Sequence, residues 1–237
     1  MPGILYLIPS ALGDAPWTTY VPAETRETAC RLTRFIAENA KTTRGELKRL
    51  GHPLPLRDIA IEQLPEKLSP ADIERLLAPV LAGNDVGVMS EAGCPGVADP
   101  GALIVRRAHV LGITVKPLVG PSSLLLALMA SGLEGQRFAF HGYLPAREPE
   151  RSRRINELEK ESARLGETQM FIETPYRNDT LFKALLGACR PNTRLCLATD
   201  LTLPAETVAT RTITDWRRQP PPELERRPTV FLLLSEG

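Results

Sequence analysis

Apolar residues in the first half of the chain form short continuous runs that alternate with stretches of helical spacing. The runs predict strands over residues 4–9, 56–64, 85–90 and 112–120, and the stretches predict helices over 22–40, 41–51, 69–83 and 99–111. The clearest boundaries belong to the helix 69–83, where Ser69 can cap, Pro70 suits the first turn and Gly83 follows the end. This alternation predicts a parallel sheet covered by helices on both faces.

The second half has a different pattern, because some of its strands follow one another directly. Strands are predicted over 138–144, 168–174, 194–200, 206–213 and 229–237, with helices over 147–165 and 176–189. Between the halves, "GPSSLLLALMASGL" (120–133) predicts a helix that is apolar on all sides and therefore buried. The fold class is α/β, with a mostly parallel N-terminal sheet in a domain 1–117 and a mixed C-terminal sheet in a domain 118–237.

Composition agrees with a globular protein, since 43% of the 237 residues are apolar and 24% are charged. No apolar run reaches the roughly 18 residues that a membrane span needs. The first residues lack a basic segment and Pro9 interrupts their apolar patch, so we expect no signal peptide and a cytoplasmic protein.

Cysteine and histidine are too sparse and scattered to predict a metal site. The four cysteines show no C-x-x-C spacing and there are only three histidines, so no metal is expected. The formal net charge of +1 gives no support to nucleic-acid binding, although it does not exclude it.

Glycine, proline and small residues gather where three predicted strands end, in "PSALGD" (9–14), "SEAGCPGVADPG" (90–101) and "GPSS" (120–123). Ligands of open α/β sheets bind at the carboxyl ends of the strands, where small residues allow close approach to the backbone. The G-x-G-x-x-G, phosphate-loop and G-x-S-x-G signatures are absent. The pattern favours a ligand site without naming the ligand.

Six stretches, spread in order over nearly the whole chain, resemble the tetrapyrrole methylase superfamily and within it the branch of ribosomal RNA small subunit methyltransferase I. They are "LYLIPSALGD", "FIAENAKTTRGELKRLG", "SEAGCPGVADPG", "LVGPSSLLLALMASGL", "FAFHGYLP" and "FIETPYRNDTLFKALL". The resemblance implies a two-domain enzyme, usually a homodimer, that holds S-adenosyl-L-methionine in a cleft between its domains. It also implies ribosomal RNA or the small ribosomal subunit as a partner, and no membrane.

The resemblance also implies which residues contact the cofactor. The matching positions are Pro9, Glu91, Ala92, Gly93, Ser122, Ser123, Glu173, Pro228 and Thr229. Methyl transfer is an in-line displacement, so the protein mainly positions two reactants, and a hydroxyl acceptor must also lose its proton. Glu38 and Lys41 are the catalytic candidates for that proton transfer, with Glu91 beside them. Each of the three can equally be a surface charge or a helix-end residue.

The chain departs from the branch at positions that would face the substrate. Asn39, Ala40 and Lys41 stand where the branch has Asp-Thr-Arg, and "ATDLTL" (198–203) stands where it has "ARELTK". The leading hypothesis is a methyltransferase that O-methylates RNA, at a ribose hydroxyl of ribosomal RNA. Two alternatives stay open: a methyltransferase acting on a small molecule, and a cofactor-binding protein that has lost catalysis.

Overall fold

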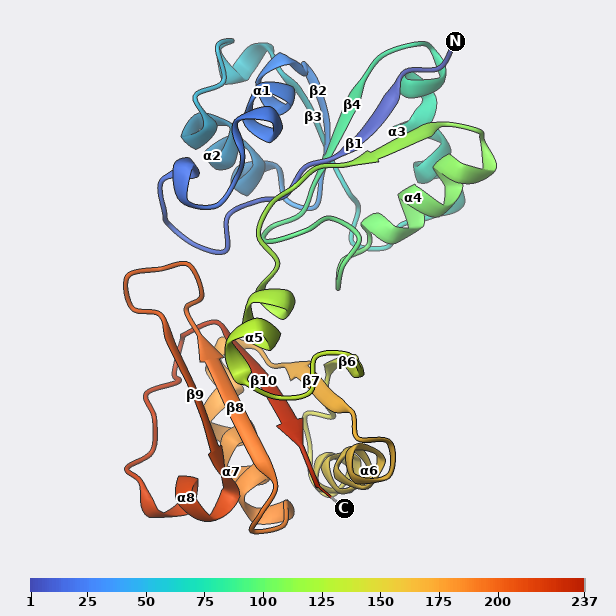
Figure 1. The fold of residues 1–237 in the computed structure, drawn as a ribbon. Coiled ribbons are helices and arrows are strands. Elements are labelled where there is room, and N and C mark those ends of the chain that lie inside the picture. Colours follow the sequence, from blue (N-terminus) through green and yellow to red (C-terminus); the bar gives the residue numbers. More distant parts are fainter. Residues whose placement is uncertain (237) are drawn as a thin grey trace. The chain divides into compact units, whose positions relative to one another are not determined.

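The computed structural model describes residues 1–236 and divides into two compact units. Unit 1 is Met1–Ser122, and unit 2 begins at Ser123 (Figure 1). The boundary predicted from the sequence lies between residues 117 and 118, five residues before this division.

Unit 1 contains a five-stranded sheet in which all strands are parallel, in the order β3-β2-β4-β1-β5. Its strands are β1 (Ile4–Leu7), β2 (Arg34–Ala37), β3 (Ala60–Gln63), β4 (Val86–Met89) and β5 (Thr114–Pro117), and its helices are α1 (Ala23–Arg31), α2 (Ala40–Leu50), α3 (Pro70–Leu81) and α4 (Gly101–Val110). The predicted parallel sheet is confirmed.

The single helix predicted over 22–40 is wrong, because α1 ends at Arg31 and β2 follows it. The apolar residues Phe35, Ile36 and Ala37 are buried in succession, with exposed fractions of 1%, 2% and 0%. A parallel strand covered on both faces shows such a continuous run instead of alternation. A run this short cannot be told from part of a helix by its spacing.

The other boundaries in unit 1 follow the predicted signals. Ser69 caps α3 in a reciprocal capping box with Asp72, and Pro70 occupies the first turn. Gly51 closes α2 in the left-handed region, with a φ of 74°. These local signals act within a few residues, which is why the sequence alone reveals them.

Neighbouring strands β1 and β4 send the chain to opposite faces of the sheet. After β1 the chain enters α1, which packs with α2, whereas after β4 it enters α4, which packs with α3 (Figure 1). Right-handed crossovers require this division, since the chain leaves β1 and β4 in opposite directions along the sheet. The loops after β1 and β4 therefore diverge at a topological switch point, the usual ligand-binding position of such sheets.

Unit 2 contains a mixed sheet in the order β6-β7-β10-β8-β9, in which only β6 and β7 are parallel. Its strands are β6 (Phe138–Tyr143), β7 (Thr168–Ile172), β8 (Arg194–Thr199), β9 (Thr207–Thr212) and β10 (Thr229–Leu234), and its helices are α5 (Ser123–Ser131), α6 (Glu150–Leu165), α7 (Asn178–Ala188) and α8 (Ile213–Arg218). The predicted mixed sheet is confirmed. The short helix α8 was not predicted.

The apolar helix α5 packs on β8, β9 and β10 through one face only. Ala127 and Leu128 are buried there, but Leu125 and Met129 are 53% and 79% exposed. The prediction that this helix is buried on every side is therefore wrong, because a single sheet covers a single face. Within residues 1–236, no helix combines the length and apolarity needed to cross a membrane.

Candidate functional site

Three loops of unit 1 meet at the carboxyl edge of its sheet. Ser10, after β1, and Gly93, after β4, exchange backbone hydrogen bonds of 2.9 and 3.1 Å. Gly120, after β5, lies so close to Pro9 that a Cβ atom on the glycine would be 2.4 Å from the proline Cβ. The structure thus brings together Pro9 and Gly93, two of the residues predicted to contact the cofactor.

Two buried serine hydroxyls hold the loop after β4. Ser10 Oγ donates to the Ser90 carbonyl oxygen at 2.9 Å, and Ser90 Oγ lies 3.2 and 3.3 Å from the carbonyl oxygens of Ala92 and Gly93. The two serines are only 3% and 5% exposed. Sequence reasoning missed both of them, although each is the small polar residue nearest the end of its apolar run.

The conformation of this loop depends on Gly93, whose φ is +72°. A side chain is rarely tolerated there, because the left-handed region crowds a Cβ atom against the backbone. The adjacent Ala92 is exposed, and its N–H donates no hydrogen bond within residues 1–236. The loop therefore presents a free backbone donor beside a conformationally special glycine.

Glu38 follows β2 and joins the same edge from the other side of β4. Its Oε2 accepts a hydrogen bond from the Glu91 N–H at 2.9 Å, although the two residues are 53 positions apart. Burial raises the pKa of the Glu38 carboxyl, and the carboxylates of Asp99 and Glu91 raise it further, against the opposing effect of the hydrogen bond. Glu38 is therefore a stronger proton acceptor than an ordinary surface glutamate.

Asp99 fixes the far end of the loop, just before α4. Its carboxylate accepts hydrogen bonds from the N–H groups of Gly96, at 2.9 Å, and Gly101, at 2.6 Å. Burial raises the pKa of Asp99, and these backbone donors oppose the rise. This residue was also missed, and the "DPG" sequence before a helix is the signal that could have found it.

The remaining predicted residues of unit 1 lie at its surface or at its end. Lys41 is exposed in the first turn of α2, and its N–H donates to the Asn39 side chain that caps this helix. Ser122 is half-buried and ends unit 1, one residue after Pro121, whose carbonyl oxygen accepts from Cys94 Sγ at 3.3 Å. Ser123 is the first residue of α5, in unit 2.

The other predicted residues of unit 2 lie at one edge of its mixed sheet, where β7 ends and β10 begins. The side chain of Glu173 is only 1% exposed, and its Oε1 accepts from the Thr174 N–H at 2.6 Å and from Arg177 at 2.7 Å. Thr229 pairs with Thr199 of β8, and their hydroxyl oxygens are 3.2 Å apart. Antiparallel pairing thus places Glu173 and Thr229 at the same end of their strands.

Arg227 connects the segments around Pro228. Its Nε donates to Asp200 Oδ2 at 2.7 Å, its Nη1 to the Glu223 carbonyl oxygen at 3.0 Å and its Nη2 to the Ala205 carbonyl oxygen at 2.7 Å. The Asp200 N–H in turn donates to the Pro228 carbonyl oxygen at 2.9 Å. One guanidinium therefore joins the segment after β8 to the loop before β10.

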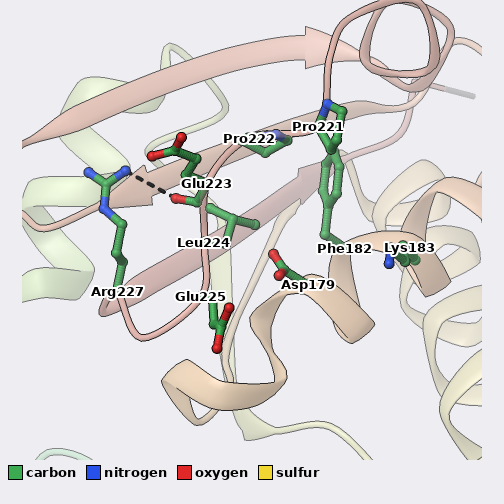
Figure 2. Close-up of a pocket in the computed structure, with 9 residues that line it drawn as sticks. All are labelled: Asp179, Phe182, Lys183, Pro221, Pro222, Glu223, Leu224, Glu225 and Arg227. Atoms are coloured by element: carbon green, nitrogen blue, oxygen red, sulfur yellow. Dashed lines mark hydrogen bonds between the residues drawn. The ribbon is translucent and has the colours of Figure 1, made fainter.

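Figure 2 shows Arg227 reaching back to the Glu223 carbonyl oxygen at one side of a cavity of about 490 Å³. The cavity lies between α7 and the loop before β10, and its lining residues are Asp179, Phe182, Lys183, Pro221, Pro222, Glu223, Leu224, Glu225 and Arg227. Leu224 anchors that loop in the core of unit 2 and is 2% exposed. None of the residues predicted to contact the cofactor lines this cavity.

Comparison with known proteins decides the family. Residues 26–216 match the family described as Tetrapyrrole (Corrin/Porphyrin) Methylases. The chain belongs to the tetrapyrrole methylase family. It is 29% identical over 236 residues to the Ribosomal RNA small subunit methyltransferase I of Xylella fastidiosa, covering 100% of this chain and 82% of that protein. The protein of the same name from Haemophilus influenzae is 30% identical over 238 residues, covering 99% and 79%.

Solved structures agree on the fold of this tetrapyrrole methylase. The crystal structure of the methyltransferase CobJ matches with a TM-score of 0.63 and 16% identity, over 99% of this chain and 95% of that one. The predicted family and fold class are both confirmed, and the chain is an S-adenosylmethionine-dependent methyltransferase.

The edge of unit 1 suits the donor that this family uses. S-adenosylmethionine carries a sulfonium and an ammonium cation, and the carboxyl groups of Glu38, Glu91 and Asp99 lie close enough to influence one another electrostatically. The free Ala92 N–H offers a backbone contact, and Gly93 keeps the loop surface free of a side chain. The nearby carboxylates suit the cations of this donor, and the backbone N–H suits one of its hydrogen-bond acceptors.

Proposed function

We propose that this methyltransferase acts on RNA, and that its acceptor is a ribose hydroxyl in the RNA of the small ribosomal subunit. Similarity to the methyltransferases of that name runs over all of the chain and about four fifths of their length, which supports a shared substrate class. The observation that carries the proposal is Glu38, a half-buried carboxylate of raised pKa hydrogen-bonded to the loop after β4. A hydroxyl acceptor needs a proton acceptor of this kind.

The proposed donor contacts are those that the family resemblance implies, and the role of Glu38 is inferred from its contacts. S-adenosylmethionine supplies an electrophilic methyl group when it is bound. The proposed contacts of the donor are Pro9, Glu91, Ala92, Gly93 and Ser122 among the residues of unit 1, and Ser123, Glu173, Pro228 and Thr229 among those of unit 2. Glu38 uses Oε2 to hold the Glu91 N–H, while its Oε1 has no hydrogen-bond partner within residues 1–236 and takes the proton of the acceptor hydroxyl. Lys41 is the second candidate for that proton transfer.

The test is transfer of radiolabelled methyl from S-adenosylmethionine to small ribosomal subunits isolated from cells that lack this protein. Label in ribose 2′-O-methyl nucleosides after digestion supports the proposal. Label in a base, or label in a corrin or porphyrin offered instead, would contradict it and favour the small-molecule alternative. Calorimetric binding of the donor without transfer to any acceptor would favour a protein that has lost catalysis.

We further propose that the protein is a cytoplasmic homodimer, as the family resemblance implies. Leu125 and Met129 on α5 are apolar and exposed, and self-association would bury such side chains favourably. Light scattering after size-exclusion chromatography measures the mass in solution, and a mass near 26.0 kDa, that of one chain, would contradict the dimer. Cell fractionation tests the location.

A further inference from the structure

One face of α2 carries three cations and no acid. Lys41, Arg44 and Lys48 are all exposed, and their spacing of three and four residues places them within about 60° around the helix axis. Along the axis they span about 10 Å, at 1.5 Å per residue. We call these three residues the α2 basic stripe.

The stripe is unpaired, in contrast with most arginines of unit 1. Within residues 1–236 no carboxylate forms an ion pair with any of its three residues, and Arg44 Nη1 donates only to the Ala40 carbonyl oxygen of its own helix, at 3.4 Å. Arginines that do pair with carboxylates in unit 1 are Arg31, Arg49, Arg57, Arg75 and Arg107. The positive charge of the stripe is therefore available to an outside partner.

Two features of the stripe oppose the stability of the helix that carries it. Lys41 lies in the first turn, which has no acidic residue, so its charge opposes the partial positive charge of the helix N-terminus. Arg44 and Lys48 are four residues apart, where like charges repel. Lys48 in the last turn suits the helix dipole, but helix stability does not explain Lys41 in the first turn or the repulsion between Arg44 and Lys48. A bound polyanion would relieve both kinds of repulsion.

The opposite face of α2 is held firmly in unit 1. Leu47 and Leu50 are 0% and 1% exposed, and Glu46 accepts a hydrogen bond from the Tyr20 hydroxyl at 2.6 Å. Burial and the neighbouring Glu46 raise the pKa of Tyr20, which keeps this hydroxyl protonated and able to donate. The stripe is thus fixed relative to the sheet edge.

The stripe also begins beside the proposed proton acceptor. Only Asn39 and Ala40 separate Glu38, at the end of β2, from Lys41 at the start of α2. A polymer bound along the stripe would therefore extend toward Glu38.

We propose that the α2 basic stripe binds the phosphate backbone of the RNA whose ribose is presented to Glu38. This inference rests on the proposed function and names the surface on which its substrate docks. Three cations in a row over about 10 Å fit the repeated charges of a polynucleotide better than a single small anion. Because phosphate contacts carry no sequence information, the stripe contributes affinity and orientation and leaves the choice of nucleotide to other groups.

The test compares K41Q/R44Q/K48Q with a control of equal charge change, K67Q/R106Q/K116Q. The control residues are also exposed cations of unit 1 without an ion pair within residues 1–236. Binding of a fluorescein-labelled single-stranded RNA 20-mer of mixed sequence is measured by anisotropy over a range of salt concentrations. The stripe variant should bind about 10-fold more weakly or worse, and the slope of log K against log salt should fall by about 2, since each lost phosphate contact removes about 0.7. The control should change neither quantity by as much.

A third variant, R44Q/K48Q, separates docking from proton transfer by Lys41. It should raise KM for small ribosomal subunits while leaving kcat at saturating substrate and the calorimetric Kd for S-adenosylmethionine unchanged. Thermal melting should show no loss of stability, because glutamine is a good helix former and the repulsion is removed.

The outcomes distinguish this inference from the proposed function. Wild-type protein that methylates ribosomal RNA, with a stripe variant that binds RNA as tightly as the control, overturns the stripe and leaves the function standing. Wild-type protein that neither binds nor methylates RNA overturns both.

Discussion

The two sheet edges that carry the predicted cofactor residues are built in different ways. In unit 1 the edge is made of backbone: Ser10 and Gly93 bridge through main-chain hydrogen bonds, and Gly120 packs directly on Pro9. In unit 2 the edge is made of side chains, with Arg227 bound to Asp200 and Glu173 bound to Arg177. At Gly120 a new Cβ atom would overlap Pro9, and at Gly93 the positive φ disfavours a side chain, whereas a side-chain network can keep part of its bonds in a conservative variant.

This difference also separates what the two edges can do chemically. Unit 1 combines the free Ala92 N–H with Glu38, a carboxylate of raised pKa that keeps one oxygen without a partner in the described chain. In unit 2, Oε1 of the buried Glu173 carboxylate is already bound to Thr174 and Arg177. We propose that proton transfer belongs to the edge of unit 1, because Glu173 pairs with the Arg177 cation whereas the pKa of Glu38 is raised.

The largest expected effect comes from Gly93→Val, because it places a side chain in the backbone-built edge of unit 1. A β-branched residue at a φ of +72° is strained by about 1–3 kcal/mol, so the loop must leave its conformation. We expect donor binding to become undetectable by isothermal titration while circular dichroism stays that of the folded protein.

The matched control is Gly45→Ala in the exposed part of α2, where a Cβ atom would meet nothing within 4 Å. It should bind the donor normally and gain about 0.5–1 kcal/mol of stability. Unchanged donor affinity in a folded Gly93→Val protein would remove this loop from the site.

Glu38→Gln is next in size, because it removes the proposed proton acceptor but keeps an oxygen that can accept the Glu91 N–H. We expect kcat to fall about 100-fold or more. In the wild type, activity should be lost as the pH falls through the raised pKa of Glu38, so the acid limb of kcat lies above the ordinary pKa of a glutamate. The variant should lack this limb.

Glu91→Gln tests the same pH dependence of kcat in a second way. The Glu91 carboxylate raises the pKa of Glu38, so its removal should move the acid limb of kcat to lower pH while activity at neutral pH persists. A limb that does not move, together with an active Glu38→Gln enzyme, would assign proton transfer to another group.

Arg227→Ala tests the side-chain-built edge and should have a moderate effect. Three hydrogen bonds are lost and Asp200 is left with a partly buried charge, so we expect the free energy of unfolding to fall by about 2 kcal/mol. Donor affinity should fall about 10-fold if Pro228 and Thr229 contact the donor as predicted. Urea denaturation and calorimetry measure the two effects.

Two further variants test whether the planar geometry of the Arg227 guanidinium matters for stability. Arg227→Lys should retain part of the stability, since an ammonium cannot reach three acceptors with the same geometry. The neighbouring Arg226, whose side chain is 75% exposed, should tolerate Arg226→Gln with a change below about 0.5 kcal/mol. Equal losses at both positions would mean that the network around Asp200 has no special role.

The smallest effect is expected from Thr199→Val. Among the described residues 1–236 its hydroxyl bonds only to that of Thr229, which keeps its own bond to the Arg227 carbonyl oxygen at 3.0 Å. The unfolding free energy should fall by no more than about 1 kcal/mol and the Kd for the donor should change less than threefold. A large loss of affinity would show that this edge is as intolerant as that of unit 1.

Local features of this protein could be predicted from its sequence because they depend on neighbours a few residues away. The capping box of Ser69, the left-handed Gly51 and the small residues at the ends of β1, β4 and β5 all act within one turn or one loop. The parallel and mixed sheets followed from the order of these elements. The predicted family follows the same motifs, and the comparisons confirm it.

Contacts between distant segments were decided only by the tertiary structure. The strand order places β2 beside β4, and this alone brings Glu38 to Glu91; nothing in the spacing of apolar residues specifies which strands pair. For a related reason β2 was predicted as part of a helix: a strand that is buried on both faces shows no alternation of apolar and polar residues. Arg227 and Asp200 meet because β8 and β10 run antiparallel, which fixes their register through hydrogen bonds that no local pattern encodes.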